Sequence, residues 1–205
     1  MTPALEALAR GAASILGRPL ADTERAKFYK YVEQLIKWQK VHRLVGSADP
    51  LWIVEHLFLD SLLFLRLLPE TGRAVLDLGS GAGLPGLPIK IVRRDLDVTL
   101  VESRRRRASF LSTVARELEL DGLHVVAGRV EDHLPEFEGH FNAVVMRCAG
   151  DIDEMIPLAS SLLCTGGIVI AAGPPRATAL ALGDWVTVDG WSRGKSRRFA
   201  LYRNG

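Results

Sequence analysis

The chain has 205 residues, 48% of them apolar, and its 26 lysines and arginines nearly balance 24 acids. This length suits one domain, or one domain with an appendage, that buries a sizeable core. No apolar run reaches the length of a membrane span, and the N-terminus lacks a secretory signal pattern. The two cysteines, Cys148 and Cys164, have no disulfide or metal-ligand spacing. We therefore expect a soluble protein of the reducing cytoplasm, with no membrane and no metal among its partners.

Helical patterns dominate the first 70 residues. Residues 3–16 predict a short amphipathic helix, and a long helix follows from about residue 22. A third helix is expected over residues 51–68, in which His56 and Asp60 are four apart and share a face. Such a pair is either a structural or a catalytic contact, and the sequence leaves both open. The long helix carries an apolar stripe formed by Phe28, Tyr31, Val32, Leu35 and Ile36.

From residue 71 onward, apolar runs of strand length alternate with helical patterns. This alternation predicts a parallel sheet with both faces covered. Two short alternating runs near the end lack a crossover helix, so they predict an antiparallel hairpin at one edge of the sheet. We expect residues 71–205 to form this α/β domain, with residues 1–70 packed on it as a helical extension. The predicted strands are 74–78, 97–101, 123–127, 141–146, 166–172, 184–188 and 199–203, and the predicted helices between them are 86–93, 103–119 and 151–163.

A glycine-rich stretch, Val75–Gly86, begins in the first of these strands and leads into a helix. Glycines let the backbone approach a ligand where a side chain would block it, and the amides of a helix N-terminus favour an electron-rich group. The segment Gly81–Gly86 matches the dinucleotide fingerprint G-x-G-x-x-G. The strand, however, already ends at Gly79, Asp77 would repel a pyrophosphate, and Pro85 occupies a turn that a dinucleotide loop uses for amide contacts. A loop for S-adenosylmethionine is therefore the better interpretation.

Two acids support this interpretation. Asp77 can face the amino group and the positive sulfonium of the cofactor. Glu102 ends the next strand, which is the position from which a carboxylate accepts both ribose hydroxyls. The combination predicts the α/β fold of class I S-adenosylmethionine-dependent methyltransferases, which is a Rossmann-like, mostly parallel sheet with an antiparallel C-terminal edge.

Basic residues cluster in two places, at the start of the helix after Glu102 and in the C-terminal tail. Cations at a helix N-terminus oppose the helix dipole, and a polyanionic partner would explain them. A solvated surface with packed arginine stems is the alternative. Because the first cluster adjoins the cofactor strand, we favour RNA as the partner. The predicted RNA-binding residues are Arg104, Arg105, Arg106, Arg107, Arg197 and Arg198, with Arg193 and Lys195 in the same tail.

Several short motifs in the chain resemble those of a known protein family. Gly-Leu-Pro-Gly at 83–86 and Arg-Val-Glu at 129–131 are fairly specific. Together with the other motifs they resemble the bacterial guanine-N7 methyltransferases of 16S ribosomal RNA, the glucose-inhibited division protein B family, over about residues 24–173. The other motifs are Leu35-Ile36-Lys37-Trp38, Leu59-Asp60-Ser61-Leu62, Arg107-Ala108-Ser109-Phe110-Leu111 and Met146-Arg147-Cys148-Ala149.

This resemblance implies roles for particular residues. Gly79 and Leu84 would line the cofactor, Val130 and Glu131 would flank its adenine, and Arg147 would stand at the active site. With the glycine loop included, the predicted cofactor-binding residues are Asp77, Gly79, Gly81, Gly83, Leu84, Glu102, Val130, Glu131 and Arg147. The predicted catalytic residues are Arg147 and His56.

The chain departs from the family pattern in three places. Arg43-Leu44-Val45 stands where the family has Asn-Leu-Thr, and Ala172-Gly173 stands where it has Lys-Gly. His56 and Asp60 are separated by three residues instead of two. These positions lie on the substrate side in the family, whereas the cofactor side is intact. Methyl transfer is therefore better supported than the identity of the methylated base.

The chemistry of guanine N7 suits this sequence. N7 has a free lone pair, so no proton leaves before attack, and the enzyme needs positioning more than a general base. No Asp/Asn-Pro-Pro run of amino-group methyltransferases follows the fourth strand, where Arg147 and Cys148 stand instead. Arg147 can donate to guanine O6 or to a phosphate, or pair with an acid. Cys148 is either a nucleophile or, as we favour, an inert buried thiol.

We therefore expect S-adenosylmethionine-dependent methylation of N7 of a guanine in 16S ribosomal RNA. The expected partner is ribosomal RNA or the small ribosomal subunit, and the expected state is a monomer. Methylation of another RNA or of a small molecule is one alternative. A non-catalytic RNA-binding module that keeps the cofactor fold is another.

Overall fold

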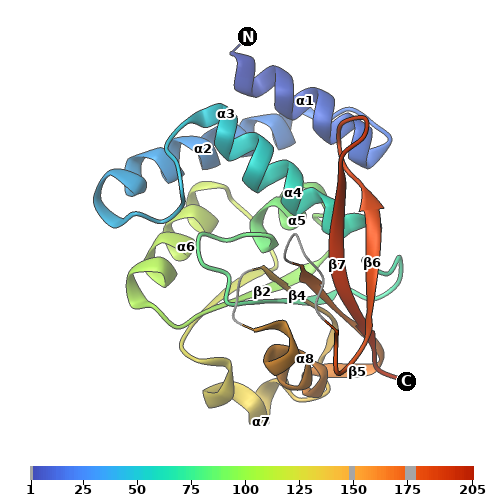
Figure 1. The fold of residues 1–205 in the computed structure, drawn as a ribbon. Coiled ribbons are helices and arrows are strands. Elements are labelled where there is room, and N and C mark those ends of the chain that lie inside the picture. Colours follow the sequence, from blue (N-terminus) through green and yellow to red (C-terminus); the bar gives the residue numbers. More distant parts are fainter. Residues whose placement is uncertain (1, 148–150, 174–178) are drawn as a thin grey trace.

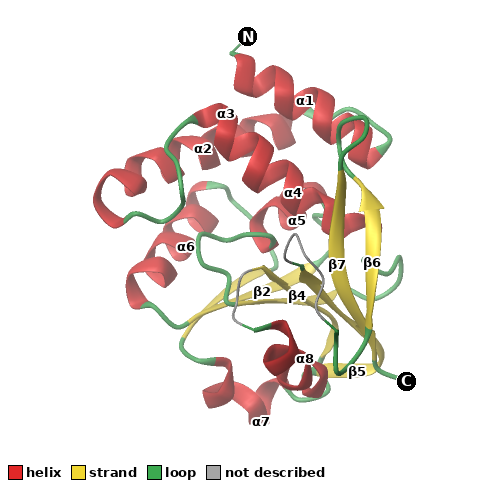
Figure 2. Ribbon diagram, in the orientation of Figure 1, coloured by secondary structure: helices red, strands yellow, loops and turns green. Residues whose placement is uncertain are grey.

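The computed structural model describes residues 2–147, 151–173 and 179–205, which form one sheet with helices on both faces (Figures 1 and 2). The strands are β1 (Ala74–Leu78), β2 (Asp97–Glu102), β3 (Leu123–Ala127), β4 (Phe141–Arg147), β5 (Leu163–Ala172), β6 (Asp184–Asp189) and β7 (Ser196–Arg203). The longer helices are α1 (Pro3–Leu16), α2 (Asp22–His42), α5 (Gly86–Val92), α6 (Arg105–Glu117) and α8 (Ile152–Ser161). The shorter helical pieces are α3 (Pro50–Ile53), η1 (Val54–Phe58), α4 (Leu59–Leu62), η2 (Leu63–Arg66), η3 (Val130–His133) and α7 (Leu134–Phe137).

The strand order is β3-β2-β1-β4-β5-β7-β6. Strands β1 to β5 are parallel, and β7 pairs antiparallel with both β5 and β6. This confirms the predicted parallel sheet with an antiparallel C-terminal edge. Because β1 lies between β2 and β4, the order of strands reverses at β1, and ligands of open α/β sheets bind beyond the carboxyl ends of the strands at such a point. The last residues of β1, β2 and β4 therefore face a common site.

Alternation along the strands divides the core into two clusters. Val75 packs with α5, α6 and the N-terminal helices, whereas Leu76 packs on the opposite face with α8. This follows from the pleat, which points successive side chains to opposite faces. The molecule therefore has three layers, with η3, α7 and α8 on one side of the sheet and the other helices on the opposite side (Figure 1).

The N-terminal helices share the core of the sheet domain. The ring of Tyr31 in α2 stacks on Phe58 of η1 with centroids 4.8 Å apart, and Trp38 meets Phe110 of α6 edge-on at 5.5 Å. All four side chains belong to the hydrophobic cluster that covers this face of the sheet or pack against it. The core is therefore continuous across the boundary that we predict at residue 70. Within the described ranges, no helix is long and apolar enough to cross a membrane.

Four local predictions differ from the structure, the first being that β5 begins at Leu163 instead of 166. The helix expected over 51–68 is a helical run of four pieces that ends at Arg66, and one of the pieces is the π-helical turn η1. Two short helices, η3 and α7, occupy a segment where no helix is predicted, because four-residue helices leave no periodic signal. Strand β7 begins at Ser196 instead of 199, because its first residues are polar and pair with β6 beyond the apolar stretch.

Candidate active site

The glycine loop joins β1 to α5 with a backbone that glycine favours. Gly79, Gly81 and Gly83 have φ values of 70°, 60° and 88°, which fall in the left-handed region. Gly86 is required for a different reason, because a Cβ there would lie 2.7 Å from Oδ2 of Asp77. The last glycine of the Gly-Leu-Pro-Gly motif thus makes room for the acid that precedes the loop.

Asp77 lies beneath this loop. Its side chain is fully buried, and its Oδ2 accepts a hydrogen bond from the Gly86 amide at 2.9 Å. Burial raises the pKa of this carboxyl to about 7, against the lowering effects of the Gly86 amide and the charge of Arg147. Oδ1 has no hydrogen-bond partner among the described residues. Asp77 therefore holds the start of α5 and keeps one buried acceptor atom without a donor.

Glu102 fixes the loop from the neighbouring strand. Its Oε2 accepts from the Gly81 amide at 2.9 Å, and its Oε1 accepts from the Arg104 amide at 2.8 Å. Arg107 Nη1 lies 4.0 Å from Oε2. Glu102 is 4% exposed, so its buried carboxylate links the loop to the start of α6.

Two pockets lie on either side of Gly79, which lines both. The larger has a volume of about 480 Å³ and the smaller about 200 Å³. The larger pocket is lined by Leu44, Val45, Gly46, Trp52, His56, Leu57, Asp60, Gly79, Ser80, Gly81, Ala82, Leu84, Arg107, Arg147 and Arg197. The smaller pocket is lined by Leu78, Gly79, Val101, Ser103, Gly128, Arg129, Val130, Glu131, Met155 and Leu158.

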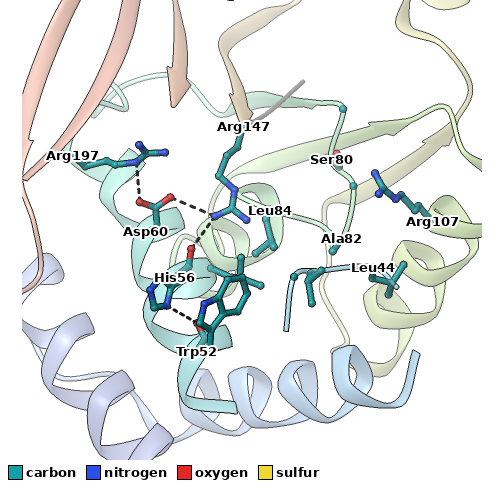
Figure 3. A pocket seen from close by; sticks show the side chains of 15 residues that line it. Leu44, Trp52, His56, Asp60, Ser80, Ala82, Leu84, Arg107, Arg147 and Arg197 are labelled. Carbon is teal, nitrogen blue, oxygen red and sulfur yellow. Dashed lines mark hydrogen bonds and ion pairs between the residues drawn. The ribbon is translucent and has the colours of Figure 1, made fainter. Parts of the chain in front are cut away.

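Asp60 is the centre of the charged wall of the larger pocket. Arg147, at the end of β4, places Nη1 3.4 Å from Oδ2 of Asp60 and 3.4 Å from the carbonyl oxygen of His56 (Figure 3). Arg197, on β7, places Nε 2.9 Å from Oδ1 of Asp60 in an ion pair without hydrogen-bond alignment. Its Nη1 donates to the Gly173 carbonyl at 2.7 Å. One acid thus orients two arginines that come from distant parts of the sequence.

The predicted pairing of His56 with Asp60 is not found among the described contacts. His56 is exposed and stacks on Trp52, with ring centroids 5.0 Å apart and planes 11° apart. Its Nδ1 lies 3.2 Å from the Trp52 carbonyl oxygen. Asp60 instead pairs with arginines, because tertiary packing brings β4 and β7 to this helix.

The spacing of His56 and Asp60 coincides with a π-helical turn. In η1 the amide of Leu59 bonds to the carbonyl of Val54, five residues back, so this turn accommodates one residue more than an α-helical turn. The chain has one residue more between His56 and Asp60 than the family pattern has. The π-helical turn accommodates this longer spacing within the helix, and Asp60 faces Arg147.

Helix α2 supports the site by contacts that the sequence did not reveal. The buried hydroxyl of Tyr31 donates to the Ala82 carbonyl of the glycine loop, and burial raises the pKa of this phenol well above its usual value. Gln39 holds Val45 at both backbone atoms, with distances of 2.6 and 2.8 Å. Leu44 and Val45 therefore line the larger pocket from a fixed loop.

The structure divides the predicted site residues into groups. Gly79, Gly81, Leu84, His56, Arg107, Arg147 and Arg197 line the larger pocket, and Val130 and Glu131 line the smaller one with Gly79. Asp77, Gly83 and Glu102 shape the loop and are not among the lining residues. Arg104, Arg105, Arg106 and Arg107 line an adjoining hollow of about 410 Å³ with Arg43. Arg198 follows Arg197 on β7 and so points to the opposite face of the strand. Cys148 lies outside the described residues.

The sheet order, the glycine loop and the acids at the ends of β1 and β2 define a class I methyltransferase, the class for which S-adenosylmethionine is the methyl donor. Precorrin-6y C5,15-methyltransferase from Geobacter metallireducens shares this fold, with a TM-score of 0.50 and 12% identity over 78% of this chain and 90% of that chain. A family model described as rRNA small subunit methyltransferase G, GidB, matches residues 24–175. The chain belongs to this family.

Two relatives carry the name ribosomal RNA small subunit methyltransferase G. The protein from Anaeromyxobacter dehalogenans is 39% identical over 81% of this chain and 76% of its own length. The protein from Methylobacillus flagellatus is 39% identical over 76% of this chain and 74% of its own length. The predicted family is thus confirmed.

Proposed function

We propose that this protein transfers a methyl group from S-adenosylmethionine to N7 of a guanine in 16S ribosomal RNA, as a monomer acting in the cytoplasm. The observation that carries the proposal is the larger pocket, where Arg107, Arg147 and Arg197 gather beside the glycine loop. The names of the relatives support ribosomal RNA of the small subunit as the substrate. The choice of N7 rests on the chemistry of the residues that line the pocket.

The glycine loop fits the cofactor. Left-handed glycines leave the loop backbone open between the two pockets, and the buried Oδ1 of Asp77 is an acceptor that a cationic ligand would favour. We propose that Val130 and Glu131 flank the adenine in the smaller pocket and that Glu102 faces the ribose. S-adenosylmethionine bound there supplies an electrophilic methyl group next to the larger pocket.

The larger pocket suits a nucleophile that has no proton to lose. The two carboxylate oxygens of Asp60 already face the guanidinium groups of Arg147 and Arg197, so neither is free to accept a proton from the substrate. His56 is exposed and stacked on Trp52. The guanidinium of Arg147 can donate to O6 of a guanine whose N7 lone pair takes the methyl group. Guanine N7 fits this set of groups better than an amine or a hydroxyl, which would need a free base.

The test is a single-turnover transfer assay with radiolabelled S-adenosylmethionine at saturation, using 30S subunits, bare 16S RNA and small molecules. We expect transfer to ribosomal RNA, 7-methylguanosine in the digested product, and a rate nearly flat from about pH 6 to 9. His56→Ala should slow transfer only modestly. A methyl group on a ribose or an exocyclic amine, or a rate rising tenfold per pH unit, would falsify the assignment to N7.

A small-molecule methyltransferase or a non-catalytic module would give a different pattern in the same assay. A small-molecule enzyme would label a compound without RNA, whereas a module that only binds RNA would give no labelled product. Where no product is labelled, calorimetry with the cofactor and then with RNA would identify the module as a protein that binds RNA without methylating it.

We also propose that Arg104, Arg105 and Arg106 bind phosphates of the substrate. They are exposed, and their hollow adjoins the larger pocket through Leu44 and Arg107, which line both. Each phosphate contact that is removed should reduce the salt slope of RNA affinity by about one. The double variant Arg104→Ala and Arg105→Ala should therefore show a flatter slope with unchanged cofactor affinity.

A further inference from the structure

A series of hollows leads away from the larger pocket along the β6–β7 hairpin. The next hollow, of about 300 Å³, shares His56, Asp60 and Arg197 with the larger pocket. A third, of about 620 Å³, surrounds the hairpin turn. We call the second and third hollows together the hairpin groove. The residues that its two parts share are Gly190, Trp191, Lys195 and Ser196.

The hairpin turn is held against the rest of the molecule. Arg66 of η2 donates to the Asp189 carbonyl, and its Nη2 lies 3.4 Å from the carbonyl of Ser14 in α1. Within the turn, the Gly190 amide donates to the Lys195 carbonyl at 2.6 Å. The tip of the hairpin accordingly lies close to α1 (Figure 1). The groove is therefore a preformed surface.

Trp191 provides the flat apolar wall of this groove. Its ring is partly buried and packs against the hydrophobic core, which fixes its orientation. Lys195 is exposed and places Nζ over the face of the ring, 5.2 Å from its centre, so a base that stacks there displaces the end of an exposed lysine side chain. An aromatic ring binds a stacked base of single-stranded nucleic acid, and a lysine that leaves the ring face for the base can reach the adjoining phosphate.

The charges of the groove match a nucleic acid strand. Arg66, Arg193, Lys195 and Arg197 line it, together with the acids Glu55, Asp60 and Asp189. Asp60 is already neutralised by its arginines, and Glu55 can accept from the amino group of a base. A small-molecule substrate would occupy one pocket and would not need this extension.

We propose that the hairpin groove binds the nucleotide next to the target guanine in a single-stranded segment of RNA. Its base stacks on Trp191, and its phosphates lie at Lys195 and Arg197. The inference rests on the proposed function, because it needs an RNA whose target base enters the larger pocket. Arg197 and Arg107 lie at opposite ends of that pocket (Figure 3). The strand therefore runs from the arginines of α6, past the glycine loop, to the hairpin.

Binding of short single-stranded RNA that contains one guanine tests the groove directly. Trp191→Ala should weaken binding about tenfold, because one stacked base is lost, whereas Trp191→Phe should retain most of the affinity. Lys195→Ala should reduce the salt slope by about one. Arg116→Ala is the matched control, because Arg116 is an exposed arginine at the far end of α6 and should change neither value. Cofactor affinity should stay constant in all variants, which shows that they are folded.

Photocross-linking locates the neighbouring nucleotide. RNA with 4-thiouridine beside the target guanine should cross-link to residues 189–197. Cross-links confined to α6, or parental affinity and salt slope in both Trp191→Ala and Lys195→Ala, would overturn the proposal. If the hairpin cross-links and its variants weaken binding while the parent protein transfers no methyl group, the groove stands and the proposed function fails. If methylation is normal and the variants are silent, the groove alone is wrong.

Discussion

The two sides of the glycine loop are built in different ways. On the cofactor side, buried carboxylates hold backbone amides, as Asp77 holds Gly86 and Glu102 holds Gly81. On the substrate side, charged side chains hold one another, as Asp60 holds Arg147 and Arg197. The first arrangement depends on residues within one β-α-β segment, and the second depends on three segments far apart in the chain.

This difference indicates how well each side of the glycine loop tolerates substitution. A backbone cradle fixed by buried acids binds a constant ligand, and few substitutions leave its geometry intact. Ion-paired side chains on a partly exposed surface can be substituted while the glycine loop keeps its conformation. The sequence analysis predicts the same division, because it assigns the departures from the family pattern (Arg43, Ala172 and the His56–Asp60 spacing) to the substrate side and none to the glycine loop.

The largest loss of cofactor affinity is expected when a side chain is added at Gly86 in the glycine loop. Gly86→Ala would place a methyl group 2.7 Å from Oδ2 of Asp77 and 2.4 Å from Cδ2 of Leu100. We expect calorimetry to show at least about a hundredfold loss of cofactor affinity, because the start of α5 must move. Gly139→Ala is the control. Its Cβ meets open space at a φ of 68°, so it should cost only about 1 kcal/mol of unfolding free energy and leave cofactor binding unchanged. Equal affinities in the two variants would mean that the loop is not a rigid cradle.

The next effect separates chemistry from cofactor binding. Arg147→Ala should lower the single-turnover rate by about a hundredfold at saturating cofactor, because a donor to the target base is lost. Cofactor affinity should change much less. Arg147→Lys keeps the charge without the planar fork and should recover only part of the rate. A rate that is unchanged in Arg147→Ala would remove this residue from the catalytic machinery.

A smaller loss of rate is expected when Arg147 and Arg197 lose their ion pairs with Asp60. Asp60→Asn keeps the shape of the side chain and removes the charge that orients Arg147 and Arg197, so the rate should fall about tenfold. Asp95→Asn breaks the exposed pair with Arg93, at 2.8 Å, and serves as the control. We expect that variant to retain the parental rate. Matching rates for Asp60→Asn and the parent would show that the ion pairs only stabilise the fold.

An effect of a different kind concerns pH and the stability of the cofactor side. Burial raises the pKa of Asp77 from its usual 3.8 to about 7, so the folded protein binds a proton that the unfolded chain has lost between these pH values. The free energy of unfolding should therefore fall by up to about 4 kcal/mol as pH rises from about 4 to about 7, and then level off. Denaturant titrations should show this trend, and Asp77→Asn should abolish it.

The same carboxyl should couple pH to cofactor binding. A cationic ligand nearby favours the ionised form of Asp77 and lowers its pKa, so binding below pH 7 should release a proton. Affinity should accordingly rise with pH up to about 7, by at most about tenfold per pH unit, and calorimetry in buffers of different ionisation enthalpy should report the proton. Asp77→Asn should bind with an affinity that does not depend on pH. Proton release that persists in this variant would assign the effect to another group.

Local signals explain what the sequence alone determined. The strand and helix alternation after residue 71, the glycine loop and the family motifs predicted the fold class and the family, because these features depend on neighbours in the chain. Asp77 and Glu102 were recognised from their places at the ends of β1 and β2. Their contacts with Gly86 and Gly81 were beyond reach, because these depend on how the loop folds back onto the strands.

Only the tertiary structure determined which residues contact one another on the substrate side. Nothing in the spacing of Asp60, Arg147 and Arg197 indicates that one carboxylate pairs with two arginines, because their sequence separation carries no periodic signal. The contact of Tyr31 with Ala82 and the place of Trp191 beside the pocket are hidden for the same reason. Such contacts form where β4, β7 and the N-terminal helices meet at the carboxyl end of the sheet. That meeting is set by the burial of apolar surface across the whole core, and local pattern does not encode it.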